Sequence, residues 1–213
     1  MVKDGAIVVF ARAPEPSKVK TRLKDALTEG QRVSLYVRLM EKAIDAAQGI
    51  DGADAYIAFT PDDAAGYFHR YRLPAFPQRG ADIGERMDNA LQHLFSLGYG
   101  KAVLIGCDIP HISTEILAGA FRELDVAGGT TNGLKVVFGP TFDGGYYLVG
   151  LRRGDSGSAS MLFRGIPWST GEVLNMTLQK AREKGYEVTL LETLRDVDTP
   201  EDLDGLGEWI LSI

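Results

Sequence analysis

Short apolar segments alternate along the chain with longer segments in which apolar residues recur at helical spacing. The short segments are rich in β-branched residues and predict strands at Ala6–Phe10, Ala55–Thr60, Lys101–Ile105, Val136–Phe138, Tyr146–Leu151 and Glu187–Leu191. Alternation of strands with helices is typical of a sheet that is covered by helices. The pattern therefore predicts an α/β fold.

Helix starts are indicated by capping residues between these strands. Thr28 precedes Gln31 by three residues, which is the spacing of a capping box, and apolar residues then line one face of the helix that follows. Four more helix starts are predicted, two from the same spacing and two from a proline at the first helical position: Asp82 with Glu85, Ser169 with Glu172, Thr60-Pro61 and Thr199-Pro200.

The composition is that of one globular domain, and we expect a single domain over residues 1–213. The chain is 45% hydrophobic and contains no repeats or low-complexity tracts. Its 23 Lys and Arg against 29 Asp and Glu give a net charge of −6. This balance argues against nucleic acid as a partner, although a local basic pocket is compatible with it.

The number of cysteines and the length of the apolar stretches indicate the cellular compartment in which the protein is expected. Cys107 is the only cysteine, so the chain forms no internal disulfide and no thiol cluster for zinc or iron–sulfur. No apolar stretch has the length of a signal-peptide core or of a membrane span. We expect a cytoplasmic protein without an integral membrane segment, and the sequence does not indicate the oligomeric state.

The loop after the first predicted strand concentrates positive charge. Arg12, Lys18, Lys20 and Arg22 fall within eleven positions, and only Glu15 opposes them. Ligands of open α/β sheets bind beyond the carboxyl ends of the strands, where Arg and Lys side chains neutralise phosphate oxygens. The loop predicts a site for a phosphorylated ligand, the alternative being a solvated loop. Lys20-Thr21 is not the end of a P-loop, because the upstream glycines are missing.

Two further segments supply candidate ligand-binding groups. The segment 78–86 joins a strand end to a capped helix whose free N–H groups suit a phosphate, with Arg86 nearby; simple capping is the alternative. Asp108 comes directly after a buried strand, between Gly106 and Pro110. Mg²⁺ takes oxygen ligands and shares them with substrate phosphates, so Asp108 is a candidate metal ligand or, alternatively, a turn cap.

Two acidic segments complete the set. Asp143 lies in a glycine-rich turn before two tyrosines, where it either faces a hydroxylated acceptor or sugar or forms an Asp-Gly hairpin turn. Asp196 and Asp198 stand at alternate positions before a helix that Thr199 caps, so one of them is a candidate second metal ligand.

Taken together and in this order, these segments resemble the GT-A-like nucleotide-diphospho-sugar transferase superfamily, in particular a bacterial family of small glycosyltransferase-like proteins. The resemblance covers nearly the whole chain. It rests on Phe10-Ala11-Arg12-Ala13-Pro14 with Lys20-Thr21-Arg22-Leu23, Gly84-Glu85-Arg86, Gly106-Cys107-Asp108-Ile109-Pro110, Gly139-Pro140 with Asp143-Gly144-Gly145-Tyr146, and Pro167-Trp168-Ser169. It implies a three-layer α/β/α Rossmann-like GT-A fold with a central mixed, mostly parallel sheet.

The resemblance also implies roles for the candidate residues. It places the first loop at the phosphates of a nucleotide and Asp108 at a Mg²⁺ or Mn²⁺ ion. The segment Asp196-Val197-Asp198-Thr199-Pro200 would complete the metal site. The predicted nucleotide-binding residues are Ala11, Arg12, Ala13, Lys18, Lys20, Arg22, Gln78, Gly84 and Arg86. The predicted metal ligands are Asp108, Asp196 and Asp198, and the predicted catalytic residues are Lys20 and Asp143.

Three functions fit this set of residues. The favoured one is a transferase that moves a sugar from a nucleotide-diphospho-sugar to a small-molecule acceptor. Small nucleotidylyltransferases, which use a nucleoside triphosphate and release pyrophosphate, are similar over the same segments, and fold resemblance does not choose between the two reactions. The third is a non-catalytic nucleotide sensor, which the retained Asp108, Asp196 and Asp198 disfavour.

Overall fold

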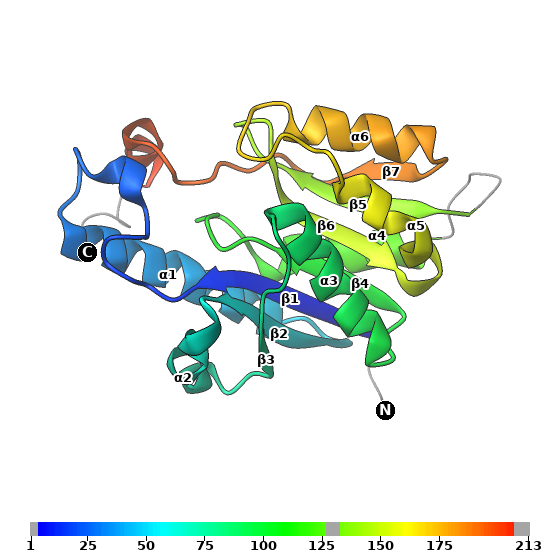
Figure 1. Cartoon of the computed structure of the whole chain (residues 1–213), viewed down its shortest axis with the longest axis horizontal. Helices are drawn as coiled ribbons and strands as arrows, with labels where there is room; N and C mark the ends of the chain where they lie inside the picture. Colours follow the sequence, from blue (N-terminus) through cyan, green and yellow to red (C-terminus); the bar gives the residue numbers. More distant parts are fainter. Residues whose placement is uncertain (1–3, 127–132, 207–213) are drawn as a thin grey trace.

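The computed structural model describes residues 4–126 and 133–206, which form a seven-stranded sheet in the order β3-β2-β1-β4-β6-β5-β7 (Figure 1). The strands are β1 Gly5–Arg12, β2 Ala53–Thr60, β3 Ala75–Pro77, β4 Lys101–Ile105, β5 Lys135–Pro140, β6 Tyr146–Arg152 and β7 Glu187–Leu190. Strand β6 is antiparallel to both of its neighbours, and the other pairs are parallel. The predicted mixed, mostly parallel sheet is confirmed.

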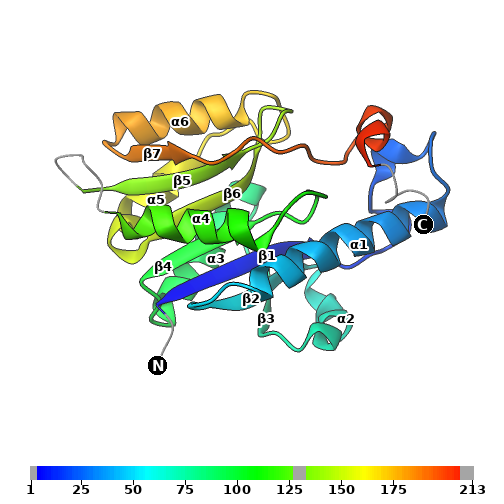
Figure 2. The same ribbon diagram turned by 180° about the vertical axis from the view of Figure 1, so that it is seen from behind.

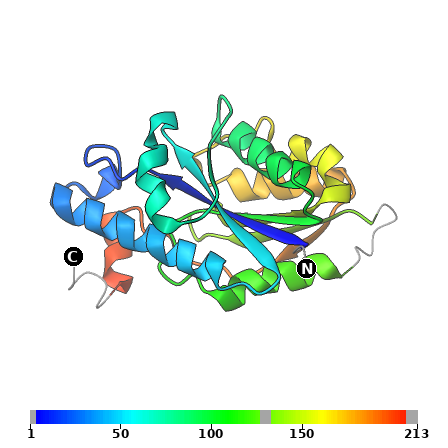
Figure 3. The same ribbon diagram turned by 90° about the horizontal axis from the view of Figure 1, so that it is seen from below.

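Helices cover both faces of this sheet and make the three layers (Figures 2 and 3). One face packs against α1 Glu29–Gln48 and α4 Thr114–Asp125, and the other against α3 Ile83–Ser96, α5 Ser156–Phe163 and α6 Val173–Glu183. The short α2 Ala65–Phe68 packs beside β2 and β3. Short 3-10 helices occur at Thr21–Leu23, Asp62–Ala64, His69–Tyr71, Arg153–Asp155 and Pro200–Gly205.

The sequence of β1 is continuously apolar because both faces of this strand are buried. Ile7 and Val9 point into the cluster that α1 and α4 cover, whereas Ala6 and Val8 point into the cluster of α3. All four side chains are fully buried, because successive residues of a strand face opposite sides and both sides are covered. The parallel pairing of β1 with β2 and β4 then brings the ends of these three strands to one edge of the sheet.

Local sequence signals fixed most element positions correctly. All six predicted strands are present, and the capping box of Thr28 and Gln31 begins α1. Asp82 accepts the backbone N–H of Glu85 at 2.8 Å and caps α3. Thr199 forms a capping box before the 3-10 helix that starts at Pro200. The prediction omitted β3, which has three residues, ends in a proline and lies at the sheet edge.

Two predicted helix starts were wrong. Ser169 does not cap a helix; it has a left-handed backbone with φ 67°, and α6 begins only at Val173. The backbone N–H of Leu174 instead donates to the carbonyl of Gly144, 2.8 Å away in the β5–β6 turn, so tertiary contact replaces the expected cap. Pro61 precedes the Asp62–Ala64 helix as its N-cap and is not its first residue.

Two segments far apart in sequence lie side by side at one end of the molecule. Figures 1 and 2 show the loop after β1, in blue, against the Pro200–Gly205 helix, in red. Leu23 and Leu27 of the loop share a small apolar cluster with Val197 and Leu206. Across the described residues, no helix combines the length and apolar character that a membrane span requires.

Candidate active site

A cavity of about 410 Å³ opens at the carboxyl ends of β1 and β4. This first cavity brings together eight residues that the sequence had singled out: Ala11, Arg12, Lys18, Lys20, Gln78, Arg86, Asp108 and Asp198. Its volume is within the range of small-ligand pockets. Four cationic side chains against two carboxylates line it, so the cavity favours an anion.

An ion pair of Lys20 with Asp108 joins the basic loop to the end of β4. The Nζ of Lys20 donates to Oδ1 of Asp108, and the two side chains are 4% and 48% exposed. Burial by itself lowers the pKa of Lys20, but the charge and hydrogen bond of Asp108 outweigh it and raise the pKa above its ordinary value of 10.5. Lys20 is therefore charged at neutral pH and largely shielded from water.

The backbone of Lys20 is left-handed, with φ 48° and ψ 42°. For a residue other than glycine this conformation costs on the order of 1 kcal/mol and persists only where the surroundings impose it. Here the burial of Lys20 and its pairing with Asp108 impose it. Such strain is characteristic of functional sites.

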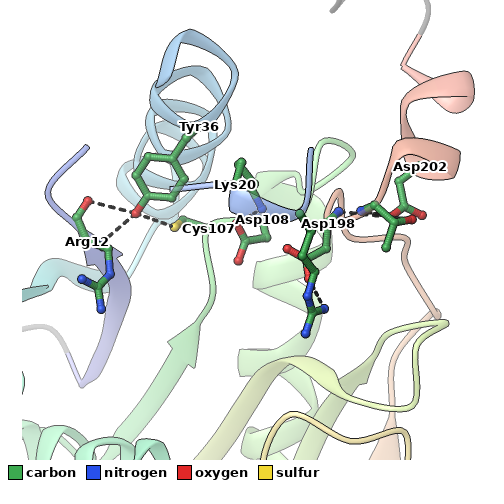
Figure 4. A network of polar contacts seen from close by, with 9 residues as sticks. Arg12, Lys20, Tyr36, Cys107, Asp108, Asp198 and Asp202 are labelled. Atoms are coloured by element: carbon green, nitrogen blue, oxygen red, sulfur yellow. Dashed lines mark hydrogen bonds and ion pairs between the residues drawn. The ribbon is translucent and has the colours of Figure 1, made fainter. Parts of the chain in front are cut away.

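Tyr36 holds the end of β1 in place (Figure 4). Its hydroxyl accepts the backbone N–H of Arg12 at 2.7 Å and donates to the Arg12 carbonyl at 2.9 Å. The thiol of Cys107 donates to the same hydroxyl at 3.5 Å. Burial, followed by the charge of Asp108, raises the pKa of Cys107 to about 12, so the thiol is protonated. Cys107 is buried and packs in the apolar cluster that α1 and α4 cover.

Gln78 and Arg86 are fixed by backbone carbonyls beside the first cavity. The side-chain amide nitrogen of Gln78 donates to the carbonyls of Ala58 at 2.9 Å and Ala11 at 3.3 Å, which ties together the ends of β1 and β2. The Nε of Arg86 donates to the carbonyl of Gly80 at 3.2 Å. Both side chains are thus positioned before any ligand arrives.

The late acidic segment docks directly onto the Asp108 loop. The backbone N–H of Val197 donates to the carbonyl of Asp108 at 3.1 Å, which brings Asp198 to the first cavity. Arg22 pairs with Asp198 at 2.6 Å, and the carboxylate of Asp202 accepts the backbone N–H of Asp198 at 3.0 Å. The predicted basic loop and the acidic segment therefore meet at the first cavity.

The donor set of this site suits a metal ion that shares its coordination with a phosphate. Asp108 and Asp198 are both partly exposed, and the charges of both raise the pKa of the same Lys20 ammonium group. Within residues 4–126 and 133–206, no group of three or more His, Cys, Asp or Glu side chains is arranged to hold a metal. Two carboxylates suffice for Mg²⁺ when phosphate oxygens and water complete the coordination.

A second cavity, of about 480 Å³, adjoins the first and contains Asp143. The residues that line both cavities are Ile83, Met87, Tyr146 and Asp198. The second cavity is also lined by Arg22 and by the loop 168–171 that precedes α6. The two predicted catalytic residues thus occupy neighbouring compartments, Lys20 in the first and Asp143 in the second.

Three predicted site residues line neither cavity. Ala13 is buried, and its N–H donates to the carbonyl of Thr60. Gly84 lies under Trp168, where an added Cβ would come within 2.6 Å of the indole, so its smallness serves packing. Asp196 is half-buried; burial, followed by the charge of Asp143, raises its pKa to about 6. Asp198 is therefore the better placed of the two late aspartates.

The positions of Tyr36 and Met87 at the first cavity were not predictable from the sequence. Tyr36 lies next to the apolar face of the helix predicted after Thr28. Its hydroxyl group, which is polar, is the one local sign that the residue does more than pack. Its partner Arg12 is 24 residues away, so only the tertiary structure reveals the contact. Met87 reads as an ordinary core residue of α3, and its place on the boundary of both cavities follows from packing alone.

Residues 43–170, more than half of the chain, match the family model described as uncharacterized protein conserved in bacteria (DUF2064). The chain belongs to this family. A crystal structure from Desulfovibrio desulfuricans G20, classed provisionally as a nucleotide-diphospho-sugar transferase, is similar to this DUF2064 protein with 33% identity and a TM-score of 0.85. The alignment covers 96% of this chain and 86% of the other. The predicted superfamily and the transferase class of enzyme are confirmed.

More distant structures share the fold of the DUF2064 protein. CMP:2-keto-3-deoxy-manno-octonic acid synthetase complexed with CTP is 11% identical, with a TM-score of 0.64 over 98% of this chain and 99% of the other. Glucosyl-3-phosphoglycerate synthase from Mycobacterium tuberculosis, in complex with Mn²⁺, UDP and glucosyl-3-phosphoglycerate, is 13% identical, with a TM-score of 0.53 over 97% of this chain and 76% of the other. No curated protein matches the sequence.

Proposed function

We propose that this chain is a metal-dependent glycosyltransferase that uses a nucleotide-diphospho-sugar as its donor. The observation that carries the proposal is the buried ammonium group of Lys20, which is held by Asp108 in a cavity lined by three further cations. A diphosphate is the ligand that this charge arrangement suits best. The relative at 33% identity, itself classed provisionally with this type of enzyme, supports the same assignment.

In this proposal the chain activates the leaving group by charge. Lys20 and Arg12 face the diphosphate and offset the negative charge that grows as its bond to the sugar breaks. Asp108 and Asp198 are the residues that would hold Mg²⁺ or Mn²⁺, which supplies a Lewis acid to the diphosphate when bound. Asp143, in the adjoining cavity, accepts the proton of the attacking hydroxyl group.

The test is to incubate the protein with Mg²⁺ or Mn²⁺ and with separate panels of sugar nucleotides and nucleoside triphosphates. Thermal shift reports binding, and mass spectrometry reports products. Release of a nucleoside diphosphate supports the proposal. Release of pyrophosphate identifies a nucleotidylyltransferase instead, and metal-independent binding without turnover identifies a sensor. Absence of binding by both panels under every metal condition refutes the proposal.

Two matched variants sharpen this test. Asp108→Asn removes a charge from the first cavity and is expected to weaken metal-dependent nucleotide binding. Asp51→Asn removes a negative charge just before β2, at the end of that strand far from the first cavity. The Asp51 side chain is exposed and lines neither cavity, so this variant is expected to leave nucleotide binding unchanged. Equal effects of the two substitutions would show that Asp108 has no specific role.

A further inference from the structure

The two adjoining cavities differ in charge. Four cations against two carboxylates line the first cavity; Lys20 pairs with Asp108 and Lys18 with Glu15, whereas Arg12 and Arg86 form no ion pair with a described residue. In the second, Arg22 is the cation among the described lining residues, and it already pairs with Asp198 at 2.6 Å. Asp143 is the second carboxylate there, and it forms no ion pair with a described residue. The second cavity therefore repels anions, whereas the first attracts them.

One oxygen of Asp143 is committed to its own turn. Oδ1 accepts the hydroxyl of Thr141 at 2.5 Å and the backbone N–H of Gly145 at 2.9 Å. Among the described residues, none donates a hydrogen bond to Oδ2. The turn is itself pressed against the loop before α6, since a Cβ on Gly144 would come within 2.1 Å of the Gly171 carbonyl. Asp143 thus presents a fixed hydrogen-bond acceptor at the cavity wall.

The rest of the wall is aromatic and apolar, with small hydroxyl groups. Trp168 makes an edge-to-face contact with Tyr146, with ring planes at 76° and centroids 6.5 Å apart, and Gly84 leaves the space in which the indole sits. Ser169 and Thr170 add hydroxyl groups, and Ser169 is held in a left-handed backbone conformation. An aromatic wall with a few fixed polar groups suits a ring that carries both C–H faces and hydroxyl groups.

We propose that the second cavity is the acceptor site and that it takes a neutral, hydroxyl-bearing molecule, a sugar or polyol, in preference to a phosphate or carboxylate. The inference rests on the proposed function and narrows its substrate class. The acceptor hydroxyl passes its proton to Oδ2 of Asp143, and its oxygen forms a bond to the anomeric carbon of the donor. The bond from that carbon to the diphosphate breaks, and its electron pair leaves with the diphosphate.

Tryptophan emission tests the ligand class directly. Trp168 lines the second cavity, and Trp209 lies outside the described residues, so Trp209→Phe isolates the signal of Trp168. In that background, with Mg²⁺ and a bound nucleoside diphosphate, we titrate matched pairs: glycerol with glycerol 3-phosphate, inositol with inositol 1-phosphate, and glucose with glucose 1-phosphate. The neutral member of at least one pair is expected to bind at least tenfold more tightly than its phosphate.

The outcomes separate this inference from the proposed function. Tighter binding of the phosphorylated members, or no change in emission with any member, overturns the acceptor assignment. Nucleoside diphosphate binding, measured by calorimetry in the same samples, tests the first cavity by itself. If the nucleoside diphosphate binds but the acceptor pairs do not behave as expected, the proposed function stands and the acceptor assignment fails. If the nucleoside diphosphate does not bind, the proposed function itself fails.

A positional test uses Asp143→Asn, which keeps an oxygen for Thr141 and Gly145 but removes the charge. Loss of a general base lowers kcat by about 10² to 10⁴-fold. We expect this fall in transfer with the neutral acceptor, while the Kd for nucleoside diphosphate changes by less than about twofold. Asp51→Asn serves as the matched control. Unchanged kcat in Asp143→Asn overturns the role of this carboxylate.

Discussion

Replacement of Lys20 by methionine measures how much the ammonium charge of Lys20 contributes to nucleotide binding. Methionine keeps an unbranched apolar stem in a position where the lysine side chain is 4% exposed. Hydrogen bonds to charged groups contribute about 1.5–3 kcal/mol, so loss of the ammonium group raises the Kd for a nucleoside diphosphate by about 10- to 150-fold. The pKa of Lys20 is raised above 10.5, so its ammonium group is charged at neutral pH, where the two affinities are compared.

Lys18→Met is the matched control, because Lys18 lines the same cavity from a side chain that is 54% exposed and pairs with Glu15 at 2.8 Å. Exposed charges contribute about 0–1 kcal/mol, which limits its effect to about fivefold. Calorimetry with UDP, GDP, CDP and ADP in the presence of Mg²⁺ measures both Kd values. Equal losses in the two variants, or a Kd within twofold of wild type in Lys20→Met, would refute the reasoning.

The stability of Lys20→Met distinguishes a binding role from a folding role. Asp108 is 48% exposed, so it remains in contact with water after its partner is removed. A half-exposed carboxylate avoids the penalty of a buried, uncompensated charge. We expect the melting temperature to stay within about 3 °C of wild type, on the order of 1 kcal/mol for a chain of this size.

Three further predictions concern the scaffold of the site. Gly84→Ala places a Cβ 2.6 Å from a backbone carbonyl of α5, and this overpacking should lower thermal stability by about 1–3 kcal/mol; an unchanged melting temperature would contradict it. Tyr36→Phe leaves the N–H and carbonyl of Arg12 without their partner and should lower the free energy of unfolding in urea by about 1–3 kcal/mol, with Tyr67→Phe as control. Burial raises the pKa of Asp202, but hydrogen bonds from the backbone N–H groups of Thr199 and Asp198 and from the side chains of Thr199 and Arg195 together outweigh it and lower the pKa below 3.8. This carboxylate therefore stabilises the fold above pH 3.8 and ceases to do so as the pH falls through its folded pKa, so an Asp202→Asn variant should lose less stability on acidification than wild type.

The strands and most helix starts followed from local chemistry. Apolar runs with turn signals located six strands, and the spacing of Thr28 and Gln31 located α1, because strand burial and capping depend on neighbouring residues. Ser169 has the same capping spacing but does not cap. There the loop meets the β5–β6 turn, and a hydrogen bond from Leu174 to Gly144 replaces the local one.

Some features of the candidate site were likewise predictable from the sequence, and others depended on tertiary contacts. Positive charge after β1 and a carboxylate after β4 were visible in sequence, since both follow strands whose ends meet at one edge of a sheet. The sequence did not show that Asp198 lines the first cavity whereas Asp196 does not. This difference depends on the hydrogen bond from Val197 to the carbonyl of Asp108, 89 residues earlier, which orients the segment.

The sequence by itself thus determined the α/β class, the strand positions and the types of charge that the loops carry. Only the tertiary structure decided that Lys20 is buried against Asp108, that Tyr36 fixes Arg12, and that Asp143 lies in a separate cavity. Local elements form from interactions over a few residues, and their pattern is written in the chain. Burial, pairing and cavity shape depend on which distant segments pack together, and that is settled only when the whole core closes.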